Sequence, residues 1–207
     1  MSDEQTVFIV DDDEGVRDGL SLLLATVGQT CELYECGHEF LDAYDDDKRG
    51  CLVLDIRMPR MTGLDLQKKL LELDSTLPII FITGHGDIPM AVEAMRRGAL
   101  DFIRKPFREH DLLERINEAL NIDADAHRKA VDRQELAERL SKLSEREKEV
   151  FDRVADGHMN KVIAGDLGIS ERTVEVHRGQ VMKKLDVRTL AQLVRVKIAM
   201  ELNSEAR

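Results

Sequence analysis

Three acidic side chains follow two short apolar runs, at positions where a carboxylate needs a chemical reason. Asp55 follows the run 51–54, and Asp11 and Asp12 follow the run 7–10. Runs of this length and composition are typical of buried β-strands. Because an unpaired buried carboxylate is costly, acids at the ends of two buried strands indicate a cation site.

The first 120 residues alternate between strand-like and helix-like segments, and this alternation decides where the strand ends lie. The strand-like segments are residues 7–10, 31–34, 51–54, 78–82 and 101–103. The amphipathic segments are residues 16–27, 38–44, 63–73, 88–97 and a last one from Glu109. Five alternations predict an α/β fold with a doubly wound, five-stranded parallel sheet. In the strand order 2-1-3-4-5, the order reverses between the first and third strands, where such folds bind ligands.

The carboxyl edge of this predicted sheet gathers groups suited to phosphoryl chemistry. Asp11, Asp12 and Asp55 meet at the reversal point, and Thr83 and Lys105 follow the fourth and fifth strands. Carboxylate oxygens suit a hard cation such as Mg²⁺, and a carboxylate can form a covalent aspartyl phosphate. The ammonium and hydroxyl groups can bind the remaining phosphoryl oxygens.

Together these residues match a family pattern. Residues 1–120 resemble a response-regulator receiver domain, and the matching residues are Asp11-Asp12, Asp55, Met58-Pro59, Thr83 and Lys105-Pro106. The resemblance implies that Asp55 accepts phosphate from a sensor histidine kinase. It also implies that the Lys105–Pro106 peptide bond is cis.

The same resemblance assigns a metal and a switch. Mg²⁺, or Mn²⁺, would be held by Asp11, Asp12, Asp55 and the backbone carbonyl of Arg57. Thr83 would move toward the phosphoryl group, Phe102 would turn inward with it, and Lys105 would bind a phosphoryl oxygen.

The residue types alone leave simpler roles open. Thr83 could be a turn residue, Phe102 a core residue and Lys105 a surface cation. One acid of the run 11–13, above all Asp13, could cap the helix that starts at Glu14.

Charge is distributed unevenly along the chain, whose formal net charge is −11. Residues 1–140 carry 30 acidic and 17 basic side chains, whereas residues 141–207 carry 11 acidic and 13 basic ones. Residues 172–197 have seven basic side chains against two acidic ones. The asymmetry favours two domains with different partners, the second partner being a polyanion. A solvated helix face would also be basic.

Residues 121–140 contain no glycine, proline or strand-like run, and they carry a thin apolar stripe at helical spacing. This pattern predicts that the helix from Glu109 continues as a helical linker; a flexible linker is the alternative. The predicted domains are therefore residues 1–120, a linker at 121–140, and residues 141–207.

The last segment has an all-helical pattern. Ser144 and Glu147 form a capping-box pattern, and Gly157 ends the helix that follows. Two further helices, residues 160–167 and 171–185, are separated by the turn Gly168-Ile169, with Ser170 as the second cap. A fourth helix is predicted at about residues 189–200. The short turn between two helices is typical of a helix-turn-helix, whose second helix enters the DNA major groove.

This segment resembles the LuxR-type helix-turn-helix. The matching residues are Leu143-Ser144, Arg146-Glu147, Gly157, Asn160-Lys161, Ile163-Ala164, Leu167, Ile169-Ser170, Thr173-Val174, His177, Lys184-Leu185 and Val187. With the receiver pattern, the chain resembles the FixJ/NarL class of transcription factors. The stretch Gly84-His85-Gly86-Asp87 places it closer to the FixJ and StyR side.

The resemblance assigns two sets of DNA contacts. Thr173, Glu175, Val176, Arg178 and Gly179 would face DNA, and Lys161, His177, Lys183 and Lys184 would contact its backbone. Basic side chains help the approach to phosphates but carry no sequence information. Glu175 can accept a hydrogen bond from cytosine N4; alternatively, it tunes repulsion or pairs with Arg172 or Arg178. Val174 and Leu185 are expected in the core.

The combined resemblance implies a two-component response regulator that is not itself an enzyme. Its implied partners are a sensor histidine kinase, promoter DNA, RNA polymerase and, on phosphorylation, a second copy of the chain; most relatives activate transcription. The unphosphorylated receiver is expected to mask the recognition helix. An alternative to this regulator is a DNA-binding protein that does not depend on phosphorylation and uses the receiver only to dimerise.

Other classes of protein fit the sequence less well. The aspartyl phosphatase signature DxDx[TV] needs Thr or Val at Gly15, and no GxxxxGK[ST] nucleotide loop is present. No apolar stretch approaches the roughly 20 residues that span a bilayer, and no signal-peptide pattern is present. Cys31, Cys36 and Cys51 form no CxxC pair. The sequence therefore predicts a cytoplasmic protein with reduced cysteines and no membrane contact.

Overall fold

The computed structural model describes residues 5–84 and 88–205. His85, Gly86 and Asp87, part of the stretch singled out above, lie outside the described residues. Contacts within the chain divide it into two compact units, residues 1–128 and 129–207. Each unit is described by itself.

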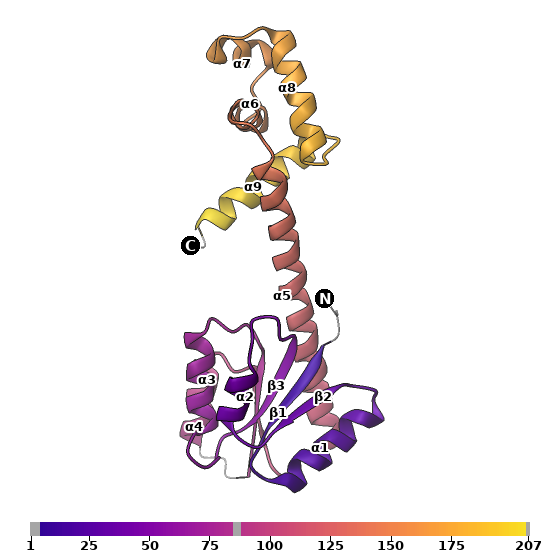
Figure 1. The fold of residues 1–207 in the computed structure, drawn as a ribbon, viewed down its shortest axis with the longest axis vertical. Helices are drawn as coiled ribbons and strands as arrows, with labels where there is room; N and C mark the ends of the chain where they lie inside the picture. Colours follow the sequence, from indigo (N-terminus) through magenta and orange to yellow (C-terminus); the bar gives the residue numbers. More distant parts are fainter. Residues whose placement is uncertain (1–4, 85–87, 206–207) are drawn as a thin grey trace. The chain divides into compact units, whose positions relative to one another are not determined.

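The first unit is a parallel sheet with helices on both faces (Figure 1). Its strands are β1 (Thr6–Val10), β2 (Cys31–Tyr34), β3 (Gly50–Asp55), β4 (Ile79–Thr83) and β5 (Asp101–Arg104). Its helices are α1 (Glu14–Thr26), α2 (Gly37–Ala43), α3 (Gly63–Glu72) and α4 (Ile88–Arg96), and α5 (Glu109–Ser141) begins in this unit and continues past residue 128. All four strand pairs are parallel, in the order β2-β1-β3-β4-β5. The predicted doubly wound fold and its strand order are confirmed.

Alternation along the strands builds two apolar layers, because successive side chains point to opposite faces. In β1, Val7 and Ile9 pack with α1 and α5, whereas Phe8 and Val10 pack with α2 and α3. Every residue of β3 is buried. Helices cover both faces of the central strands, which is why those strands are continuous apolar runs in the sequence.

The register brings the ends of the central strands to one edge. Val10 pairs with Leu54, the residue before Asp55, and Asp55 pairs with Ile82. Thr83, which ends β4, pairs with Arg104 of β5. The acids after β1 and β3 and the lysine after β5 therefore emerge at the same edge.

The second unit is helical. It contains α6 (Glu145–Ala155), α7 (Asn160–Leu167), α8 (Glu171–Lys184) and α9 (Leu190–Glu205). The predicted capping box is present: the Ser144 hydroxyl accepts from the Glu147 N–H, and Glu147 accepts from the Ser144 N–H. Gly168 closes α7 in the left-handed conformation, with φ of 65°, and the Ser170 hydroxyl caps α8. The end of α7 at Gly168 and the start of α8 at Ser170 together produce the tight turn between the two helices.

Helix α5 is the longest helix described, with 33 residues, and it includes residues 121–140. Leu112, Ile116 and Ala119 are buried against the sheet. No helix in residues 5–84 and 88–205 is both long enough and apolar enough to cross a membrane.

A buried ion pair holds α5 at the amino-terminal edge of the sheet. Arg49, just before β3, donates to Asp123 of α5 from Nη2 at 2.8 Å and from Nε at 3.0 Å. The Gln5 amide adds a hydrogen bond of 2.6 Å to Asp123 and one of 2.7 Å to the Leu120 carbonyl. Because both charged side chains are largely buried, the attraction between them must offset the loss of their hydration, and it can do so only with well-formed hydrogen bonds such as these.

Asp123→Ala is expected to destabilise the first unit by about 3–5 kcal/mol, because it removes the carboxylate from a buried guanidinium. Tyr34 and Tyr44 are the only tyrosines and the chain has no tryptophan, so tyrosine near-ultraviolet circular dichroism during urea unfolding reports on this unit alone. Asp125→Ala is the matched control, because its pair with Arg128 is exposed and contributes less than about 1 kcal/mol. Equal unfolding midpoints for the two variants would contradict the role of the buried pair.

Candidate acidic site and candidate nucleic-acid interface

The acidic site is organised around one ammonium group. Lys105 Nζ lies 2.5 Å from Asp11 Oδ2 and 3.3 Å from Asp55 Oδ1. The side chains of Asp11 and Asp55 are only 1% and 8% exposed, whereas that of Lys105 is 21% exposed. The cation therefore reaches from the rim of the site and offsets the charge of two carboxylates that burial would otherwise destabilise.

Asp55 sits in an electrostatic balance. Burial raises the pKa of its carboxyl group above the ordinary value, the Lys105 ammonium opposes that rise, and the neighbouring Asp11 adds to it. The Arg57 backbone N–H donates to Asp55 Oδ2 at 2.8 Å. One carboxylate oxygen is thus held by the backbone while the other faces the ammonium.

The three consecutive acids have three different environments. The Asp11 carboxylate is buried and accepts from the Asp13 N–H at 3.0 Å. Asp12 is exposed. The Asp13 carboxylate caps α1 by accepting from the N–H groups of Gly15 and Val16. The capping alternative therefore holds for Asp13, as the sequence analysis favoured.

Two residues that sequence reasoning did not assign also shape the site. Arg17 Nη1 donates to the Asp11 backbone carbonyl at 2.7 Å and so supports the loop after β1. A Cβ atom on Gly63 would lie 2.3 Å from the Asp55 carbonyl oxygen, so only glycine permits this approach of α3 to β3. The role of Gly63 could have been inferred from the sequence, because a glycine follows Met58-Pro59. The role of Arg17 could not, because it depends on how α1 packs back against the loop after β1.

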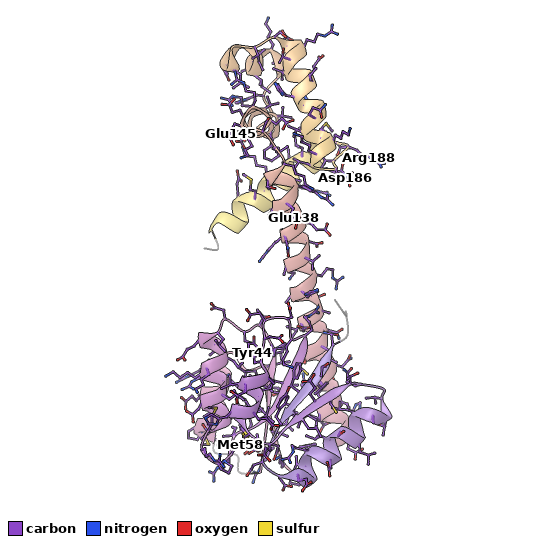
Figure 2. All side chains as sticks on the ribbon, viewed as in Figure 1. Tyr44, Met58, Glu138, Glu145, Asp186 and Arg188 are labelled. Atoms are coloured by element: carbon purple, nitrogen blue, oxygen red, sulfur yellow. The ribbon has the colours of Figure 1, made fainter. Side chains whose placement is uncertain are left out.

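The remaining predicted residues lie around the same edge. Thr83 is buried at the end of β4, and its carbonyl accepts from the Lys105 N–H at 2.8 Å. Phe102 of β5 is partly buried and packs against the layer beneath α2, α3 and α4. The Lys105–Pro106 peptide bond is cis. Met58, which follows the site, lies at the opposite end of the first unit from Tyr44 (Figure 2).

The carboxylate oxygens of the acidic site are suitable ligands for a hard divalent cation, but in this structure Lys105 forms ion pairs with two of the carboxylates. Asp11, Asp12 and Asp55 offer carboxylate oxygens, the type of ligand that Mg²⁺ prefers. Within the described ranges, no three acidic, histidine or cysteine side chains are placed to share a metal ion. Asp11 and Asp55 instead share the ammonium. Because Mg²⁺ keeps several waters, few direct protein ligands are required.

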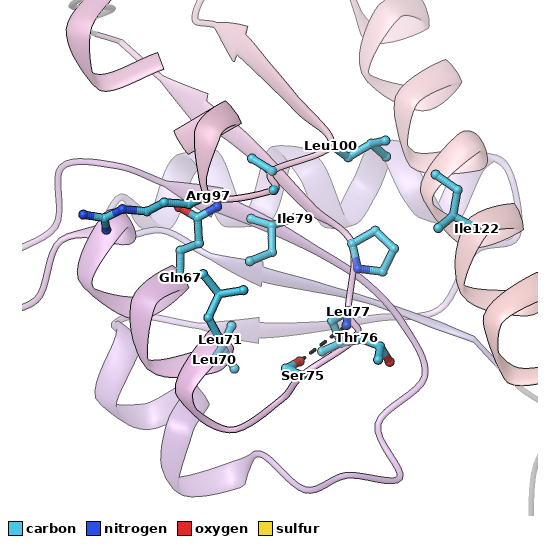
Figure 3. A pocket seen from close by; sticks show the side chains of 13 residues that line it. Gln67, Leu70, Leu71, Ser75, Thr76, Leu77, Ile79, Arg97, Leu100 and Ile122 are labelled. Carbon is cyan, nitrogen blue, oxygen red and sulfur yellow. Dashed lines mark hydrogen bonds between the residues drawn. The ribbon is translucent and has the colours of Figure 1, made fainter. Parts of the chain in front are cut away.

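A separate pocket lies at the amino-terminal ends of the strands, opposite the acidic site (Figure 3). It has a volume of about 370 Å³ and is lined by the end of α3, the start of β4, residues 97–100 and Ile122. Gln67 donates from its amide to the Ala94 carbonyl at 3.0 Å. None of the predicted acidic-site residues lines this pocket, so it is separate from the acidic site.

The candidate nucleic-acid interface is the outward face of α8. Val174, Val181 and Leu185 are buried in the core of the second unit, as expected for the first and last of these. The opposite face exposes Arg172, Glu175, Val176, Gly179, Gln180 and Lys183. Their spacing of three, four and seven residues places them on one stripe.

Several predicted DNA contacts have partners within the protein. Lys184 Nζ lies 2.6 Å from Glu147 Oε2, and this ammonium lowers the pKa of the Glu147 carboxyl group. Arg178 Nη1 donates to Asn160 Oδ1 at 3.4 Å, and Thr173 Oγ1 lies 2.8 Å from Ser170 Oγ. His177 is partly buried, whereas Lys161 and Lys183 are exposed. The exposed stripe is therefore better placed to meet a ligand than Lys184.

Comparisons with known proteins give matches for both units. Residues 7–117 match the response regulator receiver domain, and residues 141–197 match the LuxR family of bacterial regulatory proteins. Response regulator protein TmoT of Ectopseudomonas mendocina is 47% identical over 95% of this chain and 90% of its own length. FixJ of Rhizobium meliloti is 45% identical over 95% of this chain and 96% of its own length. The low-resolution structure of the response regulator StyR superimposes with a TM-score of 0.89 at 45% identity, covering 95% and 99% of the two chains.

Each unit thus matches its own family, and relatives that span both units join them in the same order. The chain belongs to the two-component response regulators that combine a receiver domain with a LuxR-type helix-turn-helix DNA-binding domain.

Proposed function

We propose that a sensor histidine kinase phosphorylates Asp55 and that the phosphoryl group controls promoter binding by the helix-turn-helix domain. The observation that carries this proposal is the placement of Lys105 between the buried carboxylates of Asp11 and Asp55. That arrangement places a carboxylate nucleophile and a cation together at the carboxyl ends of the strands. The chain itself acts as a phosphoacceptor and regulator, and we do not assign it an independent enzymatic activity.

The transfer requires Asp55 to be ionised. Its carboxylate attacks the phosphorus of a phosphohistidine, a P–O bond forms, and the P–N bond breaks with its electron pair returning to the imidazole nitrogen. Lys105 favours this step because its ammonium opposes the rise of the Asp55 pKa. After transfer, the same ammonium can bind a phosphoryl oxygen.

We assign Mg²⁺, or Mn²⁺, to Asp11, Asp12, Asp55 and the backbone carbonyl of Arg57. Such a cation would offset the repulsion between the acids and the incoming phosphoryl oxygens. The burial of Asp11 and Asp55 supports this assignment, because two neighbouring buried carboxylates share the single ammonium of Lys105 and a divalent cation would offset more of their charge. Lys105 would release Asp11 when the cation binds.

Thr83 and Phe102 are the proposed switch residues. Thr83 ends β4 and follows Ile82, the strand partner of Asp55, which supports a role for its hydroxyl toward a phosphoryl oxygen. Phe102 lies on β5, pairs in register with Phe81 and is only partly buried, so inward rotation would bury the part of the ring that is now exposed. A ligand that favours one of two arrangements shifts the population toward it.

The output is proposed to be transcriptional activation in the cytoplasm. Phosphorylation would release the masked α8 and favour a homodimer that binds paired half-sites and contacts RNA polymerase. The exposed stripe of α8 and the basic charge of residues 172–197 support DNA as the partner.

Incubation with acetyl phosphate and Mg²⁺ is expected to add one phosphoryl group to the wild type and none to Asp55→Asn, because the amide is not a nucleophile. Intact-mass spectrometry measures the adduct. Asp18→Asn is the control, since it removes an exposed acid of α1 and should leave the adduct unchanged. An adduct retained by Asp55→Asn would assign the phosphate elsewhere, and no adduct on the wild type would remove the main support for the proposal.

Two adjacent lysines are expected to behave differently in DNA binding. Lys183→Ala should weaken binding to any duplex and lower the slope of log affinity against log salt by about 1, because an exposed phosphate contact is lost. Lys184→Ala should leave the slope unchanged but destabilise the domain by roughly 1–3 kcal/mol, because Glu147 loses its cation.

Fluorescence anisotropy of a labelled duplex at several salt concentrations gives the slopes, and urea unfolding followed by far-ultraviolet circular dichroism gives the stabilities. A reduced slope for Lys184→Ala would show that Lys184 leaves Glu147 to contact a phosphate.

A further inference from the structure

The recognition face of α8 carries an unusual set of side chains for a helix that approaches a polyanion. Glu175 is an exposed carboxylate, and among the described residues it makes no ion pair or side-chain hydrogen bond. The alternative pairing with Arg172 or Arg178 is therefore absent here. Val176, beside it, is 57% exposed. A hydrogen-bond acceptor and a branched apolar group on this face are therefore both available to a ligand.

Gly179 lies on the same stripe, one turn further along. A Cβ atom at this position would meet nothing within 4 Å, and its φ is not in the left-handed region. Neither packing nor backbone conformation within the protein therefore requires glycine. Glycine in a helix interior is less favourable than alanine by about 0.5–1 kcal/mol. Glycine on an exposed helix face is suited to the close approach of another molecule.

We infer that Glu175 and Val176 read a cytosine and a nearby thymine in the major groove, and that Gly179 allows α8 to approach the bases. This inference rests on the proposed DNA-binding function and adds the identity of the bases. A carboxylate only accepts hydrogen bonds, and cytosine N4 presents a donor. Adenine N6 is a less suitable donor because the N7 acceptor beside it repels the carboxylate. The methyl groups of Val176 match the C5-methyl of thymine.

Repulsion between Glu175 and the DNA phosphates can be distinguished from recognition of a base by Glu175. Any acidic residue near DNA weakens binding to every sequence, and its removal strengthens binding without a change in base preference. Base readout predicts a different result, because preference at one base pair changes when the side chain changes. Glu171 lies one turn earlier on α8, is exposed and carries the same charge, so it provides the matched comparison.

The first experiment selects binding sites from randomised duplexes with the full chain, treated with acetyl phosphate and Mg²⁺ or left untreated. Wild type is expected to select a site with one cytosine whose replacement weakens binding about fivefold. Glu175→Gln should shift the preference at that base pair to adenine, because glutamine binds adenine N6 and N7 together. Glu171→Gln should bind more tightly and keep cytosine.

The outcomes separate the inference from the proposed function. If wild type selects a site and Glu175→Gln selects the same cytosine, the readout by Glu175 is wrong while DNA binding stands. If wild type selects no site in either state, the DNA-binding function itself fails, and the inference fails with it.

The thymine contact has its own test in the selected duplex. Uracil in place of each thymine in turn removes only a methyl group, and one such change should weaken wild-type binding about fourfold, from the roughly 0.8 kcal/mol of a buried methyl-sized group. Val176→Ala should bind the thymine and uracil duplexes alike. An equal loss in wild type and Val176→Ala at every thymine would overturn the assignment.

Gly179→Ala should have opposite effects on folding and binding. The domain should unfold at a higher urea concentration, because alanine favours the helix, whereas binding to every duplex should weaken, because the methyl group holds α8 away from DNA. Unfolding by far-ultraviolet circular dichroism and binding by anisotropy measure the two effects. Unchanged or tighter binding would show that close approach does not require glycine.

Discussion

The receiver domain depends on one ammonium group placed between two buried carboxylates. The carboxylates of Asp11 and Asp55 lie at the ends of buried strands, where negative charge needs compensation, and Lys105 provides it from the rim. The compensation is incomplete, since burial still raises the pKa of Asp55. Lys105 thus faces both the carboxylate that is proposed to accept the phosphoryl group and its acidic neighbour, and this ion pair connects the stability of the fold with its proposed chemistry.

The sheet order is what makes this ion pair possible. The ends of β1, β3 and β5 reach one edge only because β1 lies beside β3 and all strands are parallel. The opposite edge carries the Arg49–Asp123 pair, which fixes the part of α5 that packs on the sheet. The chemistry and the attachment of α5 are thus separated by the full length of the strands, and each edge uses a buried charge pair for a different purpose.

In the DNA-binding domain, an ion pair similarly decides which side chains remain available. Glu147 completes the cap of α6 and also holds Lys184 of α8, so one carboxylate connects two helices. Lys184 is thereby turned toward the protein, although the family pattern alone groups it with the phosphate contacts. The exposed stripe that remains contains Glu175, Val176, Gly179 and Lys183, and its chemistry combines an acceptor, an apolar group, an open position and a cation.

The sequence by itself determined the alternation of strands and helices, the acids at the strand ends, the caps at Asp13, Ser144 and Ser170, and the family of each domain. These features depend on periodicity and on interactions between residues close in the chain, which a linear pattern records. Only the tertiary structure decided that Arg17 supports Asp11, that Arg49 meets Asp123 across 74 positions, and that Lys184 pairs with Glu147 rather than remaining exposed. The physical reason is that long charged side chains reach several neighbours, and the partner that each one finds is set by how distant segments pack.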